Sequence, residues 1–130
     1  MTQSAASGSD EATMISREFA DRFAEEWIES WNSRDLDRIL SHYDDDFVMS
    51  SPRIVVIAGE PSGVLRGKPA IAAYWHRALE LAPDLRFELI ATFVGADGLV
   101  LHYSGVRGPA MEVFFFDDEG KVVRSAAHYL

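Results

Sequence analysis

The chain has 130 residues, of which 48% are hydrophobic and 25% are charged, and these proportions predict one globular domain with a single core. Its formal net charge of −9 repels phosphate groups, so nucleic acids and anionic membranes are not expected partners. The absence of cysteine excludes disulfides, thiolate metal sites and cysteine nucleophiles, and is compatible with a cytoplasmic location, which we predict.

Small and polar side chains dominate the first segment, residues 1–15. Such a segment cannot bury enough apolar surface to offset the entropy lost on ordering, so we predict a disordered leader there. No apolar run in the chain approaches the roughly 20 residues that a membrane-spanning helix needs. We therefore expect one domain over residues 16–130.

Three helices are predicted in the first two thirds of the chain. The first is long and amphipathic, because aromatic side chains recur at every fourth position. These side chains are Phe19, Phe23, Trp27 and Trp31. Asp35 can cap a second, short helix, and Pro69 suits the first turn of a third helix that ends before Pro83.

Strands are predicted for most of the remaining sequence. Residues 47–51 alternate in polarity and end at Pro52, which lacks the N–H that a sheet needs. Residues 54–57 predict a further short strand, followed by a loop that contains three turn-forming residues. The last third predicts a four-stranded antiparallel meander, with strands at 85–94, 99–105, 111–116 and 121–129.

Helices followed by a meander pack most economically as a bent sheet that closes over the first and third helices. The expected fold class is therefore α+β. Polar and aromatic side chains on the facing surfaces are the candidates to line an apolar pocket between the layers. These are Trp27, Trp31, Tyr43, Ser51, Trp75, Ser104, Phe114 and Tyr129, with Tyr74 as a further candidate. Aromatic side chains at helical spacing also occur in an ordinary core without a ligand.

One polar pair in the meander is a candidate for catalysis. If the turn is centred on Arg107, residues whose numbers sum to 214 lie opposite each other, and His102 then faces Glu112. An imidazole beside a carboxylate among apolar neighbours can act as a general acid and base. The same pair also fits a plain cross-strand polar contact, so both interpretations stay open.

Other kinds of site have little support. His42, His76 and His128 lack the spacing of metal ligands, and no glycine-rich phosphate motif occurs, so we predict neither a metal nor a nucleotide cofactor. Arginines in the loops can meet an anionic group on a ligand, although such arginines in an acidic protein are usually solvated. They are Arg53, Arg66 and Arg107.

Three runs of sequence, in order, resemble the nuclear transport factor 2-like superfamily, and especially its SnoaL-like and ketosteroid isomerase-like branches. The runs are WIESWNSRDLDRILSHYDDDFVMSSP, GKPAIAAYW and VFFFDDEGKVVRSAAHY. The resemblance covers residues 19–130 and implies a cone-shaped, cystatin-like fold, in which a curved antiparallel sheet is wrapped by three helices around an apolar pocket. It also implies a homodimer formed through the sheet face.

The resemblance argues against steroid isomerisation. The oxyanion-hole tyrosine of the isomerases falls on Trp27, the catalytic aspartate on Ser51 and the second oxyanion-hole acid on Glu112. Serine is not a base at neutral pH, so that mechanism is not expected here. SnoaL-like cyclases are thought to use acidic and histidine groups without a cofactor, a role that His102 and Glu112 could fill.

Our main hypothesis is a SnoaL-like protein that binds a small, largely apolar molecule, with possible cofactor-free acid/base catalysis of the isomerase, cyclase or lyase type. The alternative is a non-catalytic dimer or scaffold whose cavity is filled by its own aromatic side chains. Its sheet face, with Val113, Phe115 and Val123, would recruit an identical or a different partner. A hydratase or epoxide-opening enzyme would need several polar groups to position water, and no such set is evident.

Overall fold

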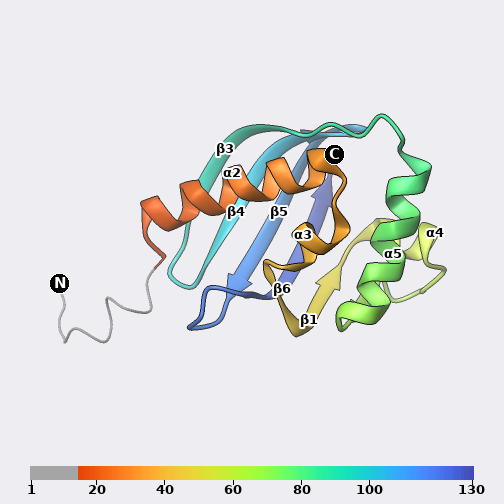
Figure 1. Cartoon of the computed structure of the whole chain (residues 1–130), viewed down its shortest axis with the longest axis horizontal. Coiled ribbons are helices and arrows are strands. Elements are labelled where there is room, and N and C mark those ends of the chain that lie inside the picture. Colours follow the sequence, from red (N-terminus) through yellow and green to blue (C-terminus); the bar gives the residue numbers. More distant parts are fainter. Residues whose placement is uncertain (1–14) are drawn as a thin grey trace.

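A computed structural model describes residues 15–130, which form four helices and a six-stranded sheet (Figure 1). The helices are α2 (Arg17–Ser33), α3 (Leu36–Leu40), α4 (Pro52–Ile57) and α5 (Lys68–Leu81). The strands are β1 (Tyr43–Ser50), β2 (Val64–Arg66), β3 (Glu88–Val94), β4 (Gly98–Gly105), β5 (Gly108–Phe116) and β6 (Val122–Tyr129). The predicted α+β class is confirmed.

The leader predicted over residues 1–15 lies outside the described residues, except for its last position. There the backbone N–H of Ile15 donates to the carbonyl of Ala96 at 3.1 Å, and Ile15 is half-buried. This contact ties the start of α2 to the loop between β3 and β4. None of the helices among the described residues is long and apolar enough to cross a membrane.

The sheet has the strand order β2-β1-β6-β5-β4-β3, and neighbouring strands are antiparallel except for the parallel pair β1 and β6. Strands β3 to β6 form the meander that the sequence predicts. The helices α2 and α3 lie across one face of the curved sheet, and α4 and α5 lie beside its β1 end (Figure 1). We call the face towards the helices the inner face and the other one the outer face.

The capping residues explain where α2 and α3 begin and end. The Ser16 hydroxyl accepts a hydrogen bond from the backbone N–H of Phe19 at 3.0 Å. Asp35 caps α3 as predicted, since its carboxylate accepts from the N–H of Arg38 at 3.2 Å. Between the two helices Arg34 adopts a left-handed conformation with φ 62°, which ends α2 and turns the chain sharply.

The predicted strand over residues 54–57 is wrong, because this segment belongs to the helix α4. Ser51 accepts a hydrogen bond from the N–H of Arg53 at 3.1 Å, and Pro52 occupies the first turn, where a helix needs no N–H donor. The predicted loop after it contains β2, which pairs with β1. The described domain therefore has four helices, one more than expected.

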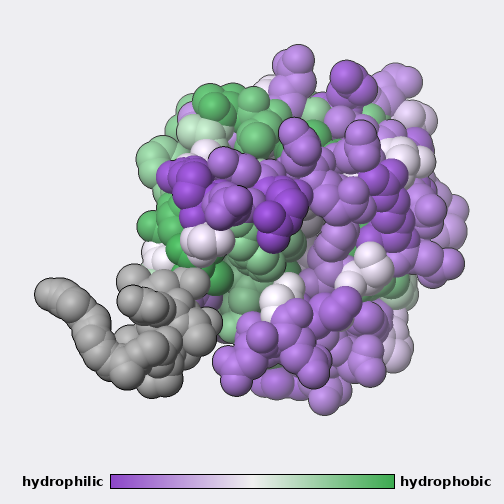
Figure 2. Space-filling view, turned by 60° about the vertical axis from the view of Figure 1, so that its left-hand side comes forward, coloured by the Kyte–Doolittle hydropathy of each residue, from purple (hydrophilic) through white to green (hydrophobic). Residues whose placement is uncertain are grey.

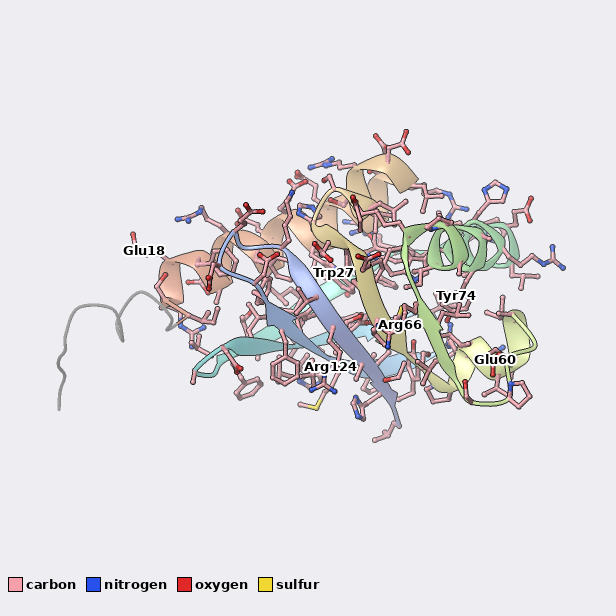
Figure 3. The ribbon with its side chains drawn as sticks, turned by 90° about the horizontal axis from the view of Figure 1, so that it is seen from below. Glu18, Trp27, Glu60, Arg66, Tyr74 and Arg124 are labelled. Atoms are coloured by element: carbon pink, nitrogen blue, oxygen red, sulfur yellow. The ribbon has the colours of Figure 1, made fainter. Side chains whose placement is uncertain are left out.

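An aromatic cluster packs between α2, α5 and the inner face of the sheet. Trp27 is 1% exposed, and its ring centroid lies 5.2 Å from that of Tyr103 and 5.5 Å from that of Phe114. Figure 3 shows Trp27 and Tyr74 between the helices and the sheet, whereas Arg124 lies on the outer face. The aromatic repeat of α2 thus packs into the core, as its spacing predicts.

Apolar side chains remain exposed on parts of the sheet that no helix covers. Figure 2 shows hydrophobic side chains gathered on one flank of the molecule, beside a largely hydrophilic surface. The exposed hydrophobic side chains of β3 are Leu89, Ile90, Phe93 and Val94. Met111 on β5 is also exposed. Apolar surface of this kind is a candidate for contact with a partner.

Candidate functional site

A cavity of about 320 Å³ lies between the sheet and the helices α2, α4 and α5. Its walls include side chains from both layers and from the turn between β4 and β5. Most of them are apolar or aromatic, among them Trp27, Trp31, Trp75 and Phe87. This size and lining are typical of a site for a small molecule.

Contacts between distant segments hold the cavity open. Arg34 donates hydrogen bonds to the carbonyls of Leu79 at 2.6 Å and Ala82 at 2.9 Å, which ties the end of α5 to the end of α2. Asn32 donates to the carbonyl of Phe87 and accepts from its N–H, at 3.0 Å and 2.7 Å. These bonds place Phe87 in the cavity wall and fix the end of α5 beside the end of α2.

Glu112 is the acidic group inside this cavity, and it is 3% exposed. Burial raises the pKa of Glu112 from 4.5 to about 7, while a hydrogen bond from Tyr103 opposes the shift. The Tyr103 hydroxyl donates to Oε1 of Glu112 at 3.2 Å. Near neutral pH the carboxyl therefore populates both its neutral and its ionised form, as a group that exchanges protons with a substrate requires.

The charge of Glu112 affects the pKa of four tyrosines. Burial raises the pKa of Tyr43, Tyr74, Tyr103 and Tyr129, and the negative charge of Glu112 raises it further. For Tyr74 the resulting pKa is about 12. All four hydroxyls therefore stay protonated at neutral pH and can donate hydrogen bonds.

The two tryptophans of α2 differ in their hydrogen bonds. Nε1 of Trp27 donates to the Tyr43 hydroxyl at 2.9 Å. Nε1 of Trp31 is buried and has no acceptor among the described residues, although Trp31 lines the cavity. A buried N–H without a partner is costly, so Trp31 carries an unsatisfied donor in a residue of the cavity wall.

The predicted pairing of His102 with Glu112 is wrong. His102 pairs with Met111, and Glu112 pairs with Leu101, so opposite residues sum to 213 rather than 214. The turn has two residues between Gly105 and Gly108, and its centre lies before Arg107 rather than on it. A slip of one residue reverses the face of every side chain, so His102 lies on the outer face and Glu112 on the inner face.

Of the eight predicted pocket residues, four line the cavity: Trp27, Trp31, Trp75 and Tyr129. Tyr43 and Phe114 are fully buried in the adjoining core. Ser51 caps α4. Hydrogen bonds between its side chain and Tyr74 and Tyr129 lower the pKa of each tyrosine. Ser104 does not line the cavity. The one-residue shift in register pairs it with Pro109 and places it on the outer face.

The sequence analysis missed Tyr103 as the partner of Glu112. Gly105 and Gly108 flank a two-residue turn, but its own residues, Val106 and Arg107, are not the glycine or asparagine that marks such a turn in a sequence. With that turn, Tyr103 shares the inner face with Glu112. Tyr74 of α5, the further candidate from the sequence, lines the cavity as well.

Metal binding has no support from the described part of the chain, where no group of three or more histidine, aspartate or glutamate side chains could hold a metal ion. What the cavity offers instead is one carboxyl with a pKa near 7 and several hydrogen-bond donors. This arrangement can bind an oxygen of a small molecule and exchange a proton with it.

Comparison with known proteins identifies the family. The model of the SnoaL-like domain matches residues 24–125. A SnoaL-like protein of unknown function from Burkholderia thailandensis E264 is 55% identical, with a TM-score of 0.87 over 90% of this chain and 98% of that chain. A search of curated proteins gives no significant match.

Two more distant solved structures share the fold. One, from Methylobium petroleophilum PM1, has a cystatin-like fold and unknown function, with 19% identity and a TM-score of 0.70 over 89% of this chain and 78% of that chain. The other, a proposed polyketide cyclase from Sinorhizobium meliloti, has 18% identity and a TM-score of 0.66 over 82% of this chain and 94% of that chain. The chain belongs to the SnoaL-like domain family, with the cystatin-like, nuclear transport factor 2-like fold that the resemblance implied.

Proposed function

We propose that this protein binds a small, largely apolar molecule in the cavity and that Glu112 is the group that exchanges protons with it. The observation that supports this is a buried carboxyl with a pKa of about 7 in the wall of a cavity that is otherwise mainly apolar. A site of this kind excludes water and holds the acid/base group against the bound molecule.

The chemistry that fits is a proton transfer without a cofactor, as in an isomerase, cyclase or lyase. The ionised carboxylate of Glu112 accepts a proton from the bound molecule, and the neutral form donates one. The free N–H of Trp31 is suited to an oxygen that gains negative charge during the transfer. One related structure is described as a proposed polyketide cyclase, which is chemistry of this class.

Filling the cavity tests the proposal. Ala78 of α5 lines the cavity, so Ala78→Trp places an indole inside it, whereas Ala73→Trp adds the same group at an exposed position of the same helix. The probe is N-phenyl-1-naphthylamine, a neutral apolar dye whose fluorescence rises on binding. We expect Ala78→Trp to weaken dye binding at least about tenfold, because the added volume competes with the dye, and Ala73→Trp to leave it unchanged.

Two results would contradict this proposal. One is a wild-type protein that does not bind the dye at all. The other is equal binding by the two tryptophan variants, which would place the dye on the surface. Thermal unfolding of each variant establishes that it is folded before binding is compared.

A second candidate function is that of a dimeric module that binds through its outer face. Strand register places Phe93, Val100 and Val113 side by side on this face, and Phe115 and Met111 lie on it as well. Phe93 and Met111 are exposed. Val123, which we expected to contribute, lies at a shift in register between β5 and β6. This hypothesis also expected a cavity filled by aromatic side chains, and the open space of about 320 Å³ argues against that part.

We expect the protein to be a homodimer. Met111→Glu should dissociate it, because a carboxylate would have to be desolvated in an apolar interface. The measurement is mass by light scattering after size-exclusion chromatography. Wild-type protein should give twice the 14.5 kDa of one chain, and the variant a single chain. Ala73→Glu on α5 adds the same charge at an exposed position away from the sheet and should stay dimeric. A monomeric wild type would refute this expectation.

A further inference from the structure

Two arginines from separate parts of the chain belong to the cavity wall. Arg53 belongs to the first turn of α4, and Arg107 to the turn between β4 and β5, and both line the cavity. Arg53 is half-buried and Arg107 is exposed, whereas Glu112 and Trp31 are buried deeper inside. The fold thus brings two positive charges to the wall of one cavity, although the chain as a whole carries a net charge of −9.

These two guanidinium groups have no acidic partner in the part of the chain that the structure describes. The ion pairs found between residues 15 and 130 use Arg17, Arg38 and Arg77, together with one lysine and two histidines. Arg34 is bound to backbone carbonyls. Arg53 and Arg107 therefore keep their hydrogen-bond donors available at the cavity.

Arg53 is also held in place and acts on the interior of the cavity. Its guanidinium carbon lies 4.8 Å from the centre of the Tyr129 ring, a cation–π contact that restricts its rotamers. Its charge opposes the rise in the pKa of Tyr74 and of Tyr129, so its field reaches both cavity-wall hydroxyls. A positioned arginine beside apolar walls is typical of a site for a planar anion.

We infer that the molecule bound in the cavity is an apolar carboxylic acid, whose carboxylate is held by Arg53 and Arg107 while its apolar body lies against the tryptophans. This inference rests on the proposed function, because it names the class of molecule that the same cavity takes. A single negative charge fits better than the double charge of a phosphate, because the remaining charges of the chain are mainly negative.

A matched pair of probes tests the charge preference. We would measure the binding of 2-naphthoic acid and of its neutral counterpart 2-naphthamide by isothermal titration calorimetry at pH 7.5 and low salt. The two molecules share the same aromatic body, so the acid should bind at least about tenfold more tightly than the amide if the arginines engage its carboxylate. Raising the salt concentration should reduce this difference.

Variants assign the preference to the two arginines. Arg53→Gln and Arg107→Gln should each weaken binding of the acid, with a loss of about tenfold for the better-positioned Arg53, and should leave binding of the amide unchanged. Arg66→Gln removes the same charge from an exposed position of β2 that does not line the cavity, and should change neither. Arg53→Lys keeps the charge and should retain part of the preference, even if loss of the planar group weakens it.

The outcomes separate this inference from the proposed function. Equal binding of acid and amide, or an unchanged affinity for the acid in both glutamine variants, overturns the inference and leaves binding in the cavity intact. The inference alone is also overturned if the wild-type protein binds N-phenyl-1-naphthylamine but binds neither 2-naphthoic acid nor 2-naphthamide. Failure to bind all three molecules contradicts both proposals.

Discussion

Glu112→Gln is expected to remove a large part of the pH dependence of stability between pH 5 and pH 8. In the unfolded chain this carboxyl ionises near its usual pKa of 4.5, whereas in the folded protein its pKa is about 7 because of burial. As pH rises through this interval the unfolded state loses the proton first, so the free energy of unfolding falls. By about pH 8, roughly one unit above the folded-state pKa, both states are ionised and the loss is nearly complete.

The size of this effect follows from the pKa difference of about 2.5 between 4.5 and about 7. At about 1.4 kcal/mol for each pKa unit, the variant should gain about 2 to 3 kcal/mol relative to wild type from pH 5 to pH 8. Glutamine keeps the shape of the side chain and an oxygen that accepts from Tyr103. Urea unfolding of both proteins across this range measures the difference.

Comparison with an exposed acid isolates the contribution of Glu112. Glu119→Gln removes a carboxylate from the exposed turn between β5 and β6, and its stability should follow the wild-type pH dependence. Parallel curves for wild type and Glu112→Gln would mean that Glu112 ionises with an ordinary pKa, and the proposed acid/base role would then lose its main support.

Trp27→Ala is expected to lower the free energy of unfolding by about 3 to 5 kcal/mol. Trp27 is 1% exposed and packs against the rings of Trp31, Phe87 and Tyr103. Its removal leaves a large void between α2 and the sheet. It also removes the hydrogen bond that Nε1 of Trp27 donates to the Tyr43 hydroxyl at 2.9 Å. A loss of this size is a large fraction of the roughly 5 to 15 kcal/mol that stabilises a typical domain.

Two further variants separate packing from hydrogen bonding at this position. Trp27→Phe keeps an aromatic ring but removes the N–H, so a smaller loss of about 1 to 2 kcal/mol is expected. Glu25→Ala changes an exposed position of the same helix and should have almost no effect. Urea unfolding followed by far-ultraviolet circular dichroism measures all three. A loss below about 1 kcal/mol for Trp27→Ala would show that the core can collapse around the missing side chain.

Most of the fold could be predicted from local patterns in the sequence. The aromatic repeat of α2, the cap at Asp35 and the alternating strands of the meander each act over a few residues, so they remain visible without the tertiary structure. The segment after Ser51 was ambiguous, because four successive branched apolar residues favour a strand while the serine and Pro52 favour the start of a helix. Burial of Ile54 in the core accompanies the helical outcome.

The candidate site depended on information that is not local. In β4, Leu99, Leu101 and Tyr103 form one face, while Val100 and His102 share the other, so both faces are partly apolar and hydrophobicity alone does not select the register. The two-residue turn selected it and turned His102 away from Glu112. The sequence therefore determined that a carboxyl lies in a mainly apolar sheet. The raised pKa of Glu112 and the side chains that surround it depend on the packing of several elements. Tyr103, Trp31 and Arg53 come from three different elements, and only tertiary packing brings them to one cavity.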